Sequence, residues 1–227
     1  MDIILLAGLW LPRTVWADVE TELERLGHRP LSVALTGADD GSTTATLDDQ
    51  VATALAAVDA TERPLVVGHS AASGLAWMVA DRRPDRIAGV VLVGGFPTSD
   101  GARYADFFPV VDGVMPFPGW EPFDGPDTAD LDEATRRRLA DLTVAVPAGV
   151  SMAEVHLGDE RRHHVPTLLV CPEYTPAQVK AWIDEGDLPE LAAATQLSLV
   201  DLDSGHWPMV TRPAELARLL HDATTGA

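Results

Sequence analysis

The chain reads Leu65-Val66-Val67-Gly68-His69-Ser70-Ala71-Ala72-Ser73-Gly74 at the point that decides its fold. A short apolar run leads directly into a serine that is flanked by small residues. A serine at a sharp turn between a strand and a helix is held in a strained backbone conformation, so the residues two positions before and after it must be small. Gly68 and Ala72 meet this demand, although the usual pattern G-x-S-x-G ends in glycine. The stretch predicts a nucleophilic serine, Ser70; the alternative is a tight turn in which a buried serine caps the helix.

Strand-like and helix-like segments alternate on both sides of this turn. Short apolar or alternating runs predict strands at 3–6, 31–35, 65–67, 87–93, 166–171 and 197–202. Apolar residues at helical spacing predict helices at 15–27, 47–58, 71–79, 176–185 and after Thr211. Such alternation is typical of a parallel sheet that is covered by helices. We therefore expect an α/β fold with a mostly parallel sheet of about six strands in a single domain, residues 1–227.

The pattern changes between Phe96 and His164, where prolines and glycines interrupt every long element in the first part. A helix is predicted only in the second part, from Asp130 to Leu142. Residues 96–164 are therefore interpreted as a lid inserted into the domain. Its aromatic side chains suit either the wall of a substrate pocket or the packing of a small lid onto the sheet; they include Phe107, Phe108, Phe117, Trp120 and Phe123.

Composition limits the classes of partner. The chain has 16 basic and 35 acidic residues, a formal charge of −19, which disfavours nucleic acid and anionic membranes. Cys171 is the only cysteine, so an internal disulfide and a cysteine metal cluster are excluded. The histidines and carboxylates lack metal-ligand spacing, and no dinucleotide-binding glycine pattern occurs. We expect no metal, no cofactor and a small-molecule substrate; the oligomeric state is not indicated.

The first apolar run, 3–6, follows an acidic residue and lacks the positive flank of a secretion signal. It is interpreted as the first strand. No apolar run has the length of a membrane span. A cytoplasmic location is the expectation from these signals.

His206 is the predicted general base. A serine hydroxyl needs a base within hydrogen-bond reach, usually a histidine that a third group orients. His206 lies in Asp203-Ser204-Gly205-His206-Trp207-Pro208, directly after the last predicted strand. Catalytic groups of such sheets gather at the carboxyl ends of the strands, where Ser70 also lies. The other histidines are expected to be structural or exposed, and His69 is expected to point away from the serine.

These motifs together resemble the α/β-hydrolase superfamily over essentially the whole chain. Gly68-His69-Ser70-Ala71-Ala72 resembles its nucleophile elbow, Gly205-His206-Trp207-Pro208 its histidine turn, and Ala7-Gly8-Leu9-Trp10 its His-Gly-x-Trp loop, with alanine replacing the histidine. The likeness is greatest to small esterases, including the plant methyl-esterase and hydroxynitrile lyase branch. The resemblance implies an oxyanion hole made by the backbone N–H groups of Leu9 and Ala71. Trp10, which follows Leu9, and Trp207, which follows His206, are the expected substrate-binding residues.

The family's catalytic acid is missing from both of its usual positions. The loop after the strand at 166–171 reads Cys171-Pro172-Glu173-Tyr174-Thr175-Pro176, without the expected aspartate, and Gly94-Gly95 occupies the alternative position. Glu173 is the favoured substitute because it lies on the right loop and has a longer side chain. Asp100, Asp203 and a Ser–His dyad without an acid are the alternatives.

The resulting hypothesis is a cofactor-independent serine hydrolase. Ser70 would attack an ester, thioester or lactone of a small apolar or aromatic substrate, and His206 would transfer the proton. A non-hydrolytic lyase on the same fold and a catalytically silent binding protein are the alternatives.

Overall fold

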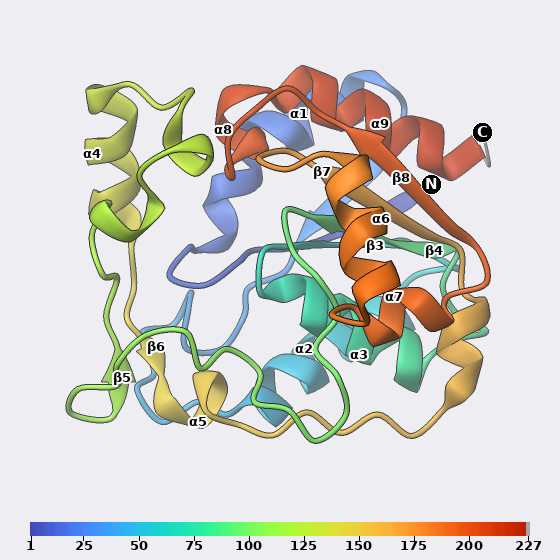
Figure 1. The fold of residues 1–227 in the computed structure, drawn as a ribbon, viewed down its shortest axis with the longest axis horizontal. Helices are drawn as coiled ribbons and strands as arrows, with labels where there is room; N and C mark the ends of the chain where they lie inside the picture. Colours follow the sequence, from blue (N-terminus) through green and yellow to red (C-terminus); the bar gives the residue numbers. More distant parts are fainter. Residues whose placement is uncertain (226–227) are drawn as a thin grey trace.

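The computed structural model describes residues 1–225 and is built on a six-stranded parallel sheet (Figure 1). The strand order is β2-β1-β3-β4-β7-β8, and every neighbouring pair is parallel. The strands are β1 (Asp2–Leu6), β2 (Arg29–Ser32), β3 (Leu65–His69), β4 (Gly89–Val93), β7 (Thr167–Cys171) and β8 (Leu197–Asp201). The predicted parallel sheet of about six strands is confirmed.

Helices cover both faces of this sheet. On one face lie α1 (Ala17–Arg25) and α9 (Pro213–Thr225); on the other lie α2 (Leu47–Asp59), α3 (Ala72–Arg82), α6 (Pro176–Glu185) and α7 (Pro189–Ala193) (Figure 1). Alternate residues of a strand enter opposite cores: Ile3 and Leu5 pack with the α1/α9 side, whereas Ile4 packs with the α2/α3 side. The central strands β3 and β4 are buried along their whole length, which explains their uninterrupted apolar sequence.

Several predicted elements begin or end a few residues elsewhere, and two of these differences bear on the fold. The second strand was expected at 31–35 but pairs with β1 over Arg29–Ser32. The Val33 N–H still donates to the Leu5 carbonyl of β1, and the Val33 and Leu35 side chains pack in the same core as α2. The first helix begins as a 3-10 turn, η1 (Arg13–Trp16), and ends at Arg25, where Gly27 with a φ of +84° reverses the chain.

The segment between β4 and β7 lies outside the sheet. It contains a small antiparallel pair, β5 (Val114–Met115) with β6 (Val146–Pro147), and the helices α4 (Glu133–Leu142) and α5 (Ala148–Ser151). Three short 3-10 turns complete it: η2 (Glu121–Phe123), η3 (Pro126–Thr128) and η4 (Glu160–His164). Figure 1 shows this segment along the left and lower edges of the molecule. We call it the lid segment; the predicted helix at 130–142 lies in it as α4.

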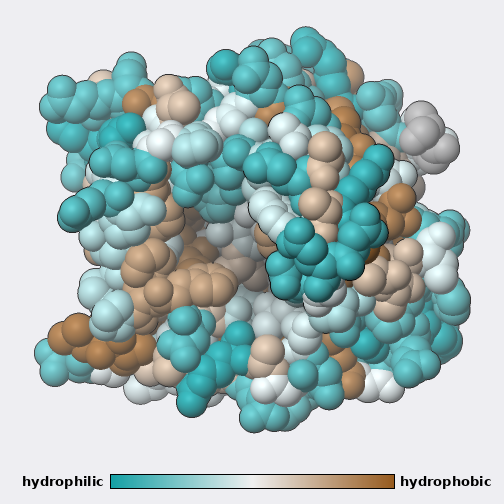
Figure 2. Space-filling view, in the orientation of Figure 1, coloured by the Kyte–Doolittle hydropathy of each residue, from teal (hydrophilic) through white to brown (hydrophobic). Residues whose placement is uncertain are grey.

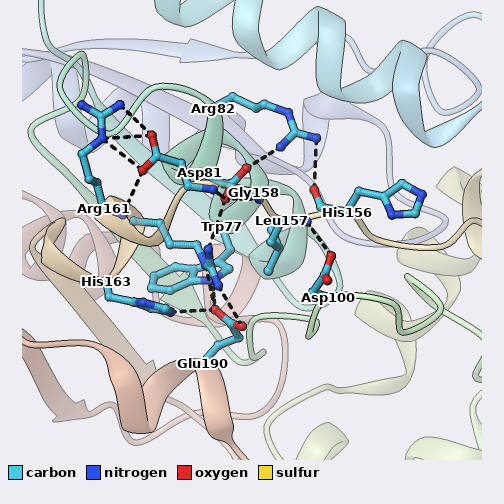
Figure 3. A network of polar contacts seen from close by, with 12 residues as sticks. Trp77, Asp81, Arg82, Asp100, His156, Leu157, Gly158, Arg161, His163 and Glu190 are labelled. Carbon is cyan, nitrogen blue, oxygen red and sulfur yellow. Dashed lines mark hydrogen bonds and ion pairs between the residues drawn. The ribbon is translucent and has the colours of Figure 1, made fainter.

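A polar network fastens the end of the lid segment to the body of the protein (Figure 3). The carboxylate of Asp81, at the end of α3, accepts hydrogen bonds from the backbone N–H groups of Gly158 and Asp159. The Arg162 side chain lies between Asp81, at 3.3 Å, and Glu190 of α7, at 2.9 Å. Because these groups are largely buried and paired, the network closes the lid segment where it rejoins the sheet.

Candidate active site

Ser70 lies on a strained turn between β3 and α3. Its φ is +54°, a left-handed conformation that residues other than glycine rarely adopt. A Cβ atom on Gly68 would lie 2.2 Å from the carbonyl oxygen of Ala72, and one on Gly95 would lie 2.1 Å from that of Ser70. The Ser70 N–H donates to the carbonyl of Val93 at 2.8 Å, which ties the turn to β4. The sequence therefore needs glycine at 68 and 95, whereas alanine is accommodated at 72.

His206 lies within hydrogen-bond reach of Ser70. It belongs to the loop between β8 and α8 (Pro208–Thr211), and its Nε2 is 2.9 Å from the Ser70 Oγ. The imidazole side chain is only 13% exposed. The carboxyl ends of β3 and β8 thus bring two residues 136 positions apart into direct contact.

Glu173 lies on the opposite side of the imidazole. Its Oε1 is 2.7 Å from the His206 Nδ1, and its side chain is 12% exposed. A carboxylate at Nδ1 favours the tautomer in which Nδ1–H donates to Glu173, so Nε2 is free to accept the Ser70 hydroxyl proton. Among residues 1–225, the second oxygen of Glu173, Oε2, is buried and has no hydrogen-bond partner.

The structure does not bring the other candidate acids to the histidine. The carboxylate of Asp100 accepts the backbone N–H of Leu157, and Asp203 is exposed. At the alternative family position, a Cβ atom on Gly94 would lie 3.3 Å from the His206 Nδ1 and 3.4 Å from the Glu173 Oε2. The absence of a side chain at 94 leaves room for the longer glutamate.

The loop after β1 passes directly beside Ser70. A Cβ atom on Gly8 would come within 3.0 Å of the Ser70 Cβ, so glycine is required at this close approach. Within the described chain, the N–H groups of Leu9 and Ala71 donate to no other residue. Two free backbone donors flanking the serine are the arrangement that an oxyanion hole needs.

A cavity of about 530 Å³ opens at Ser70. Besides Ser70, Ala71 and Glu173, its wall includes Phe96, Thr98, Tyr104, Phe107, Asp127 and Tyr174. Figure 2 shows a hollow in this face of the molecule, between the lid segment on the left and α6 on the right, with apolar residues inside it and hydrophilic ones around it. The cavity is large enough for a small organic molecule.

Trp10 and Trp207 do not line this cavity. Both rings are buried, 7% and 5% exposed, and they face a void of only about 10 Å³ together with Phe117 and Trp120. Aromatic rings of the lid segment pack against both rings. That Trp10 and Trp207 bind substrate stays a prediction.

Two residues that the sequence analysis did not assign to the site lie beside it. His69 is buried, and its Nε2–H donates to the carbonyl of His206 at 2.8 Å; burial and the neighbouring His206 hold the pKa of His69 well below its ordinary value. Asp127, on the cavity wall, accepts the His206 backbone N–H through its carbonyl. Burial, together with the charge of Glu173, raises the pKa of the Asp127 carboxyl. In the sequence, the one indication that either residue belongs to the site was the position of His69 inside the serine motif.

Residues 1–225 contain no cluster of histidine, cysteine and carboxylate side chains that could hold a metal ion. None of the described helices has both the length and the apolar character needed to cross a membrane.

Comparison with known proteins identifies the family. The model of the alpha/beta hydrolase family matches residues 3–219, so the chain belongs to this family. The predicted resemblance and the prediction of a hydrolase enzyme are thereby confirmed at the level of the family. No curated protein sequence matches the chain.

Solved structures of the same fold cover nearly the whole chain. An extracellular α/β-hydrolase from a Paenibacillus species has a TM-score of 0.80 at 17% identity and covers 98% of both chains. A methylesterase from Arabidopsis has a TM-score of 0.77 at 15% identity and covers 100% of both. A pyrethroid hydrolase from Sphingobium faniae has a TM-score of 0.73 at 18% identity, covering 99% of this chain and 97% of that one. At these identities the likeness establishes the α/β-hydrolase fold.

Proposed function

We propose that the protein is a serine hydrolase with the triad Ser70, His206 and Glu173, and that it cleaves esters, thioesters or lactones of small apolar or aromatic molecules. The observation that carries the proposal is the continuous hydrogen-bonded chain from the Ser70 hydroxyl through the imidazole to the Glu173 carboxylate, at 2.9 Å and 2.7 Å. Nucleophile, base and orienting acid in this geometry are the recurring arrangement of acyl-transfer enzymes.

In the acylation step, His206 removes the Ser70 proton as Oγ attacks the substrate carbonyl carbon. The negative charge that develops on the carbonyl oxygen is stabilised by the N–H groups of Leu9 and Ala71, each such donor contributing about 3 kcal/mol. The protonated imidazole, which Glu173 stabilises, then returns the proton to the leaving alcohol or thiol. An acyl-enzyme on Ser70 remains.

In the second step, His206 removes a proton from water, and the resulting hydroxide attacks the acyl-enzyme carbonyl. Collapse of this second intermediate breaks the bond to Ser70 Oγ, which takes the proton back from the imidazole. The carboxylic acid product leaves, and the enzyme returns to its starting state. No cofactor takes part in these steps.

The cavity supports the proposed substrate class. Aromatic side chains contribute much of its wall, including Phe96, Phe107 and Tyr174. A volume of about 530 Å³ suits a compact acyl or aromatic group. Two structural neighbours are named as a methylesterase and a pyrethroid hydrolase, and both names fit the proposed class of hydrolytic reaction. A small-molecule substrate, no nucleic acid or membrane partner, and a cytoplasmic location stay predictions.

The test is a panel of p-nitrophenyl esters, from acetate to octanoate and benzoate, assayed with the wild type and Ser70→Ala. Ser99→Ala, which changes a serine on the loop next to the cavity, is the matched control. We expect Ser70-dependent release of p-nitrophenol, greatest for short acyl or aromatic esters and unchanged in the control. A folded wild type that shows no such release would overturn the proposal and favour a non-hydrolytic or silent protein.

A further inference from the structure

The two loops that the proposed mechanism uses arise from strands that are not neighbours. Leu9 follows β1, and His206 follows β8. In the strand order, β3, β4 and β7 separate these two strands. Hydrogen bonds within the sheet therefore do not set the distance between the oxyanion donor and the base directly. The serine turn contacts both loops, through the His69 hydrogen bond to the His206 carbonyl and the close approach of Gly8 to Ser70. The lid segment adds a second connection between them.

Aromatic rings of the lid segment make this connection. Trp10 directly follows Leu9, and Trp207 directly follows His206. The ring of Phe123, in η2, lies 6.1 Å from the ring of Trp10 and 5.5 Å from that of Trp207, edge to face in both cases. Aromatic pairs in this geometry prefer a defined arrangement. Phe123 is thus a single side chain that contacts the residue next to each catalytic group.

The lid backbone reinforces the contact on the histidine side. The N–H of His206 donates to the carbonyl of Asp127 at 2.8 Å. A Cβ atom on Gly205 would lie 2.3 Å from that same carbonyl oxygen, so the two loops are in close contact. The histidine loop is therefore held from the lid segment as well as from β8.

The lid also holds the oxyanion loop. The indole N–H of Trp10 donates to the carbonyl of Met115 at 3.1 Å, and the carbonyl of Trp10 accepts the N–H of Val144 at 2.8 Å. Trp10 has a φ of +64°, a conformation that such surrounding contacts have to maintain. The ring centroid of Phe108, another lid residue, lies 5.6 Å from that of Trp10 and 5.9 Å from that of Phe123.

We propose that Phe123 is a positioning residue that fixes the distance between the oxyanion donor at Leu9 and the base His206. This inference rests on the proposed hydrolase function. Displacement of a catalytic group by about 1 Å can lower a rate by about a hundredfold, so the contact has a measurable catalytic effect. Trp10 and Trp207 act as the two attachment points of Phe123.

The experiment compares Phe123→Ala with Phe108→Ala. Both changes remove a half-buried phenyl ring from the same cluster and both rings contact Trp10, but of the two only Phe123 also contacts Trp207. With p-nitrophenyl acetate, we expect Phe123→Ala to lower kcat by about 10- to 100-fold with KM within about twofold. Phe108→Ala should lower kcat by less than about threefold. Phe123→Tyr, which keeps the ring, should restore kcat to within about threefold of the wild type.

A second readout separates this inference from the proposed function. The Nδ1–H proton of His206, hydrogen-bonded to Glu173, should give a low-field NMR signal in the wild type and in Phe108→Ala, and a weakened or absent signal in Phe123→Ala. Equal kcat values in the two alanine variants, or an unchanged His206 signal in Phe123→Ala, would overturn the positioning role. If the wild type shows no Ser70-dependent hydrolysis, the proposed function fails, and the NMR comparison still decides whether Phe123 positions His206.

Discussion

Two largely buried glutamate–histidine pairs occur among residues 1–225, and they differ in what surrounds them. In one, the Glu173 Oε1 lies 2.7 Å from the His206 Nδ1 at the carboxyl ends of the strands. In the other, the Glu190 Oε2 lies 3.1 Å from the His163 Nε2, in the network that fastens the lid segment (Figure 3). The same pair of residue types therefore occurs at two sites, to which we assign different roles.

The Glu190 carboxylate is saturated with donors. It accepts hydrogen bonds from the Trp77 indole and from the Arg162 guanidinium as well as from His163. Burial opposes ionisation, but these hydrogen bonds outweigh it and lower the pKa of Glu190 below its ordinary value. A carboxylate held in this way fixes the fold and has no free capacity for chemistry.

The Glu173 carboxylate has His206 as its one hydrogen-bond partner among residues 1–225, and the imidazole nitrogen on the far side lies 2.9 Å from a serine at an open cavity. The comparison shows that a Glu–His contact alone does not indicate catalysis. The nucleophile on the other nitrogen and the access to a cavity distinguish the two pairs. Exchanging each glutamate for glutamine tests this distinction.

The largest expected effect is on activity. Glu173→Gln replaces the carboxylate by a neutral amide that no longer stabilises the imidazolium or its reactive tautomer, so kcat should fall by about a thousandfold or more. Glu190→Gln should leave kcat within about threefold of the wild type. Both are measured as p-nitrophenyl ester hydrolysis at pH 7.5. A Glu173→Gln enzyme with wild-type kcat would point to a Ser–His dyad and contradict the role of Glu173.

The second prediction concerns stability, where Glu190→Gln should have the larger effect and Glu173→Gln the smaller. Glu190→Gln leaves the buried Arg162 with Asp81 as its remaining charged partner, which should lower the free energy of unfolding by about 3 kcal/mol. Glu173→Gln should change the free energy of unfolding by less than about 1 kcal/mol, because the Glu173 carboxylate of the wild type already has one oxygen, Oε2, without a hydrogen-bond partner. Urea unfolding at pH 7.5 measures both. Equal losses of unfolding free energy in the two variants would show that the two glutamates do not differ in their contribution to stability.

The third prediction concerns pH on the catalytic side. Burial keeps His69 neutral in the folded protein, with a pKa well below its ordinary value of 6.5. Below about pH 6.5 the unfolded chain binds a proton there that the folded chain does not, so stability falls with acidification by up to about 1.4 kcal/mol per pH unit. The slope of unfolding free energy between pH 7 and 5.5 should be smaller in His69→Gln. Identical slopes would contradict a neutral buried His69.

The smallest effect is expected at Ala72, where the serine motif departs from the usual glycine. Ala72→Gly should lower stability by about 0.5 to 1 kcal/mol, because glycine is a poorer helix former at the start of α3. The esterase rate should stay within about twofold, since the elbow requires only a small residue here. Thermal unfolding and initial rates measure the two outcomes. A rate gain above tenfold would mean that alanine distorts the turn.

Local sequence predicted the parts of the site that depend on single strands and turns. Ser70 was located by the small residues that its turn requires, and His206 by its position after the last strand. Glu173 was selected from its loop, but the space that Gly94 leaves for it depends on the packing of neighbouring strands. The parallel sheet was predicted from the alternation of strand-like and helix-like apolar segments. The bounds of β2 were predicted wrongly because this edge strand is largely exposed and its apolar pattern is weak.

Contacts that depend on the lid segment could not be predicted in the same way. Whether Trp10 and Trp207 face substrate or protein is decided by where a proline- and glycine-rich segment folds back, and its sequence has no periodic signal. The position of Asp127 on the cavity wall has the same origin. The side of the site built by the sheet was therefore accessible from the sequence, and the side built by the lid was not.

The central claim is that Ser70 is a nucleophile activated by His206 and Glu173. The most direct measurement is intact-protein mass spectrometry after incubation with a fluorophosphonate, followed by peptide mapping of the adduct. The account predicts one adduct per chain, on Ser70, formed at a rate that Glu173→Gln lowers strongly and Glu190→Gln leaves unchanged, and no adduct in Ser70→Ala. A folded wild type without an adduct, or an equal adduct in Ser70→Ala, would contradict it.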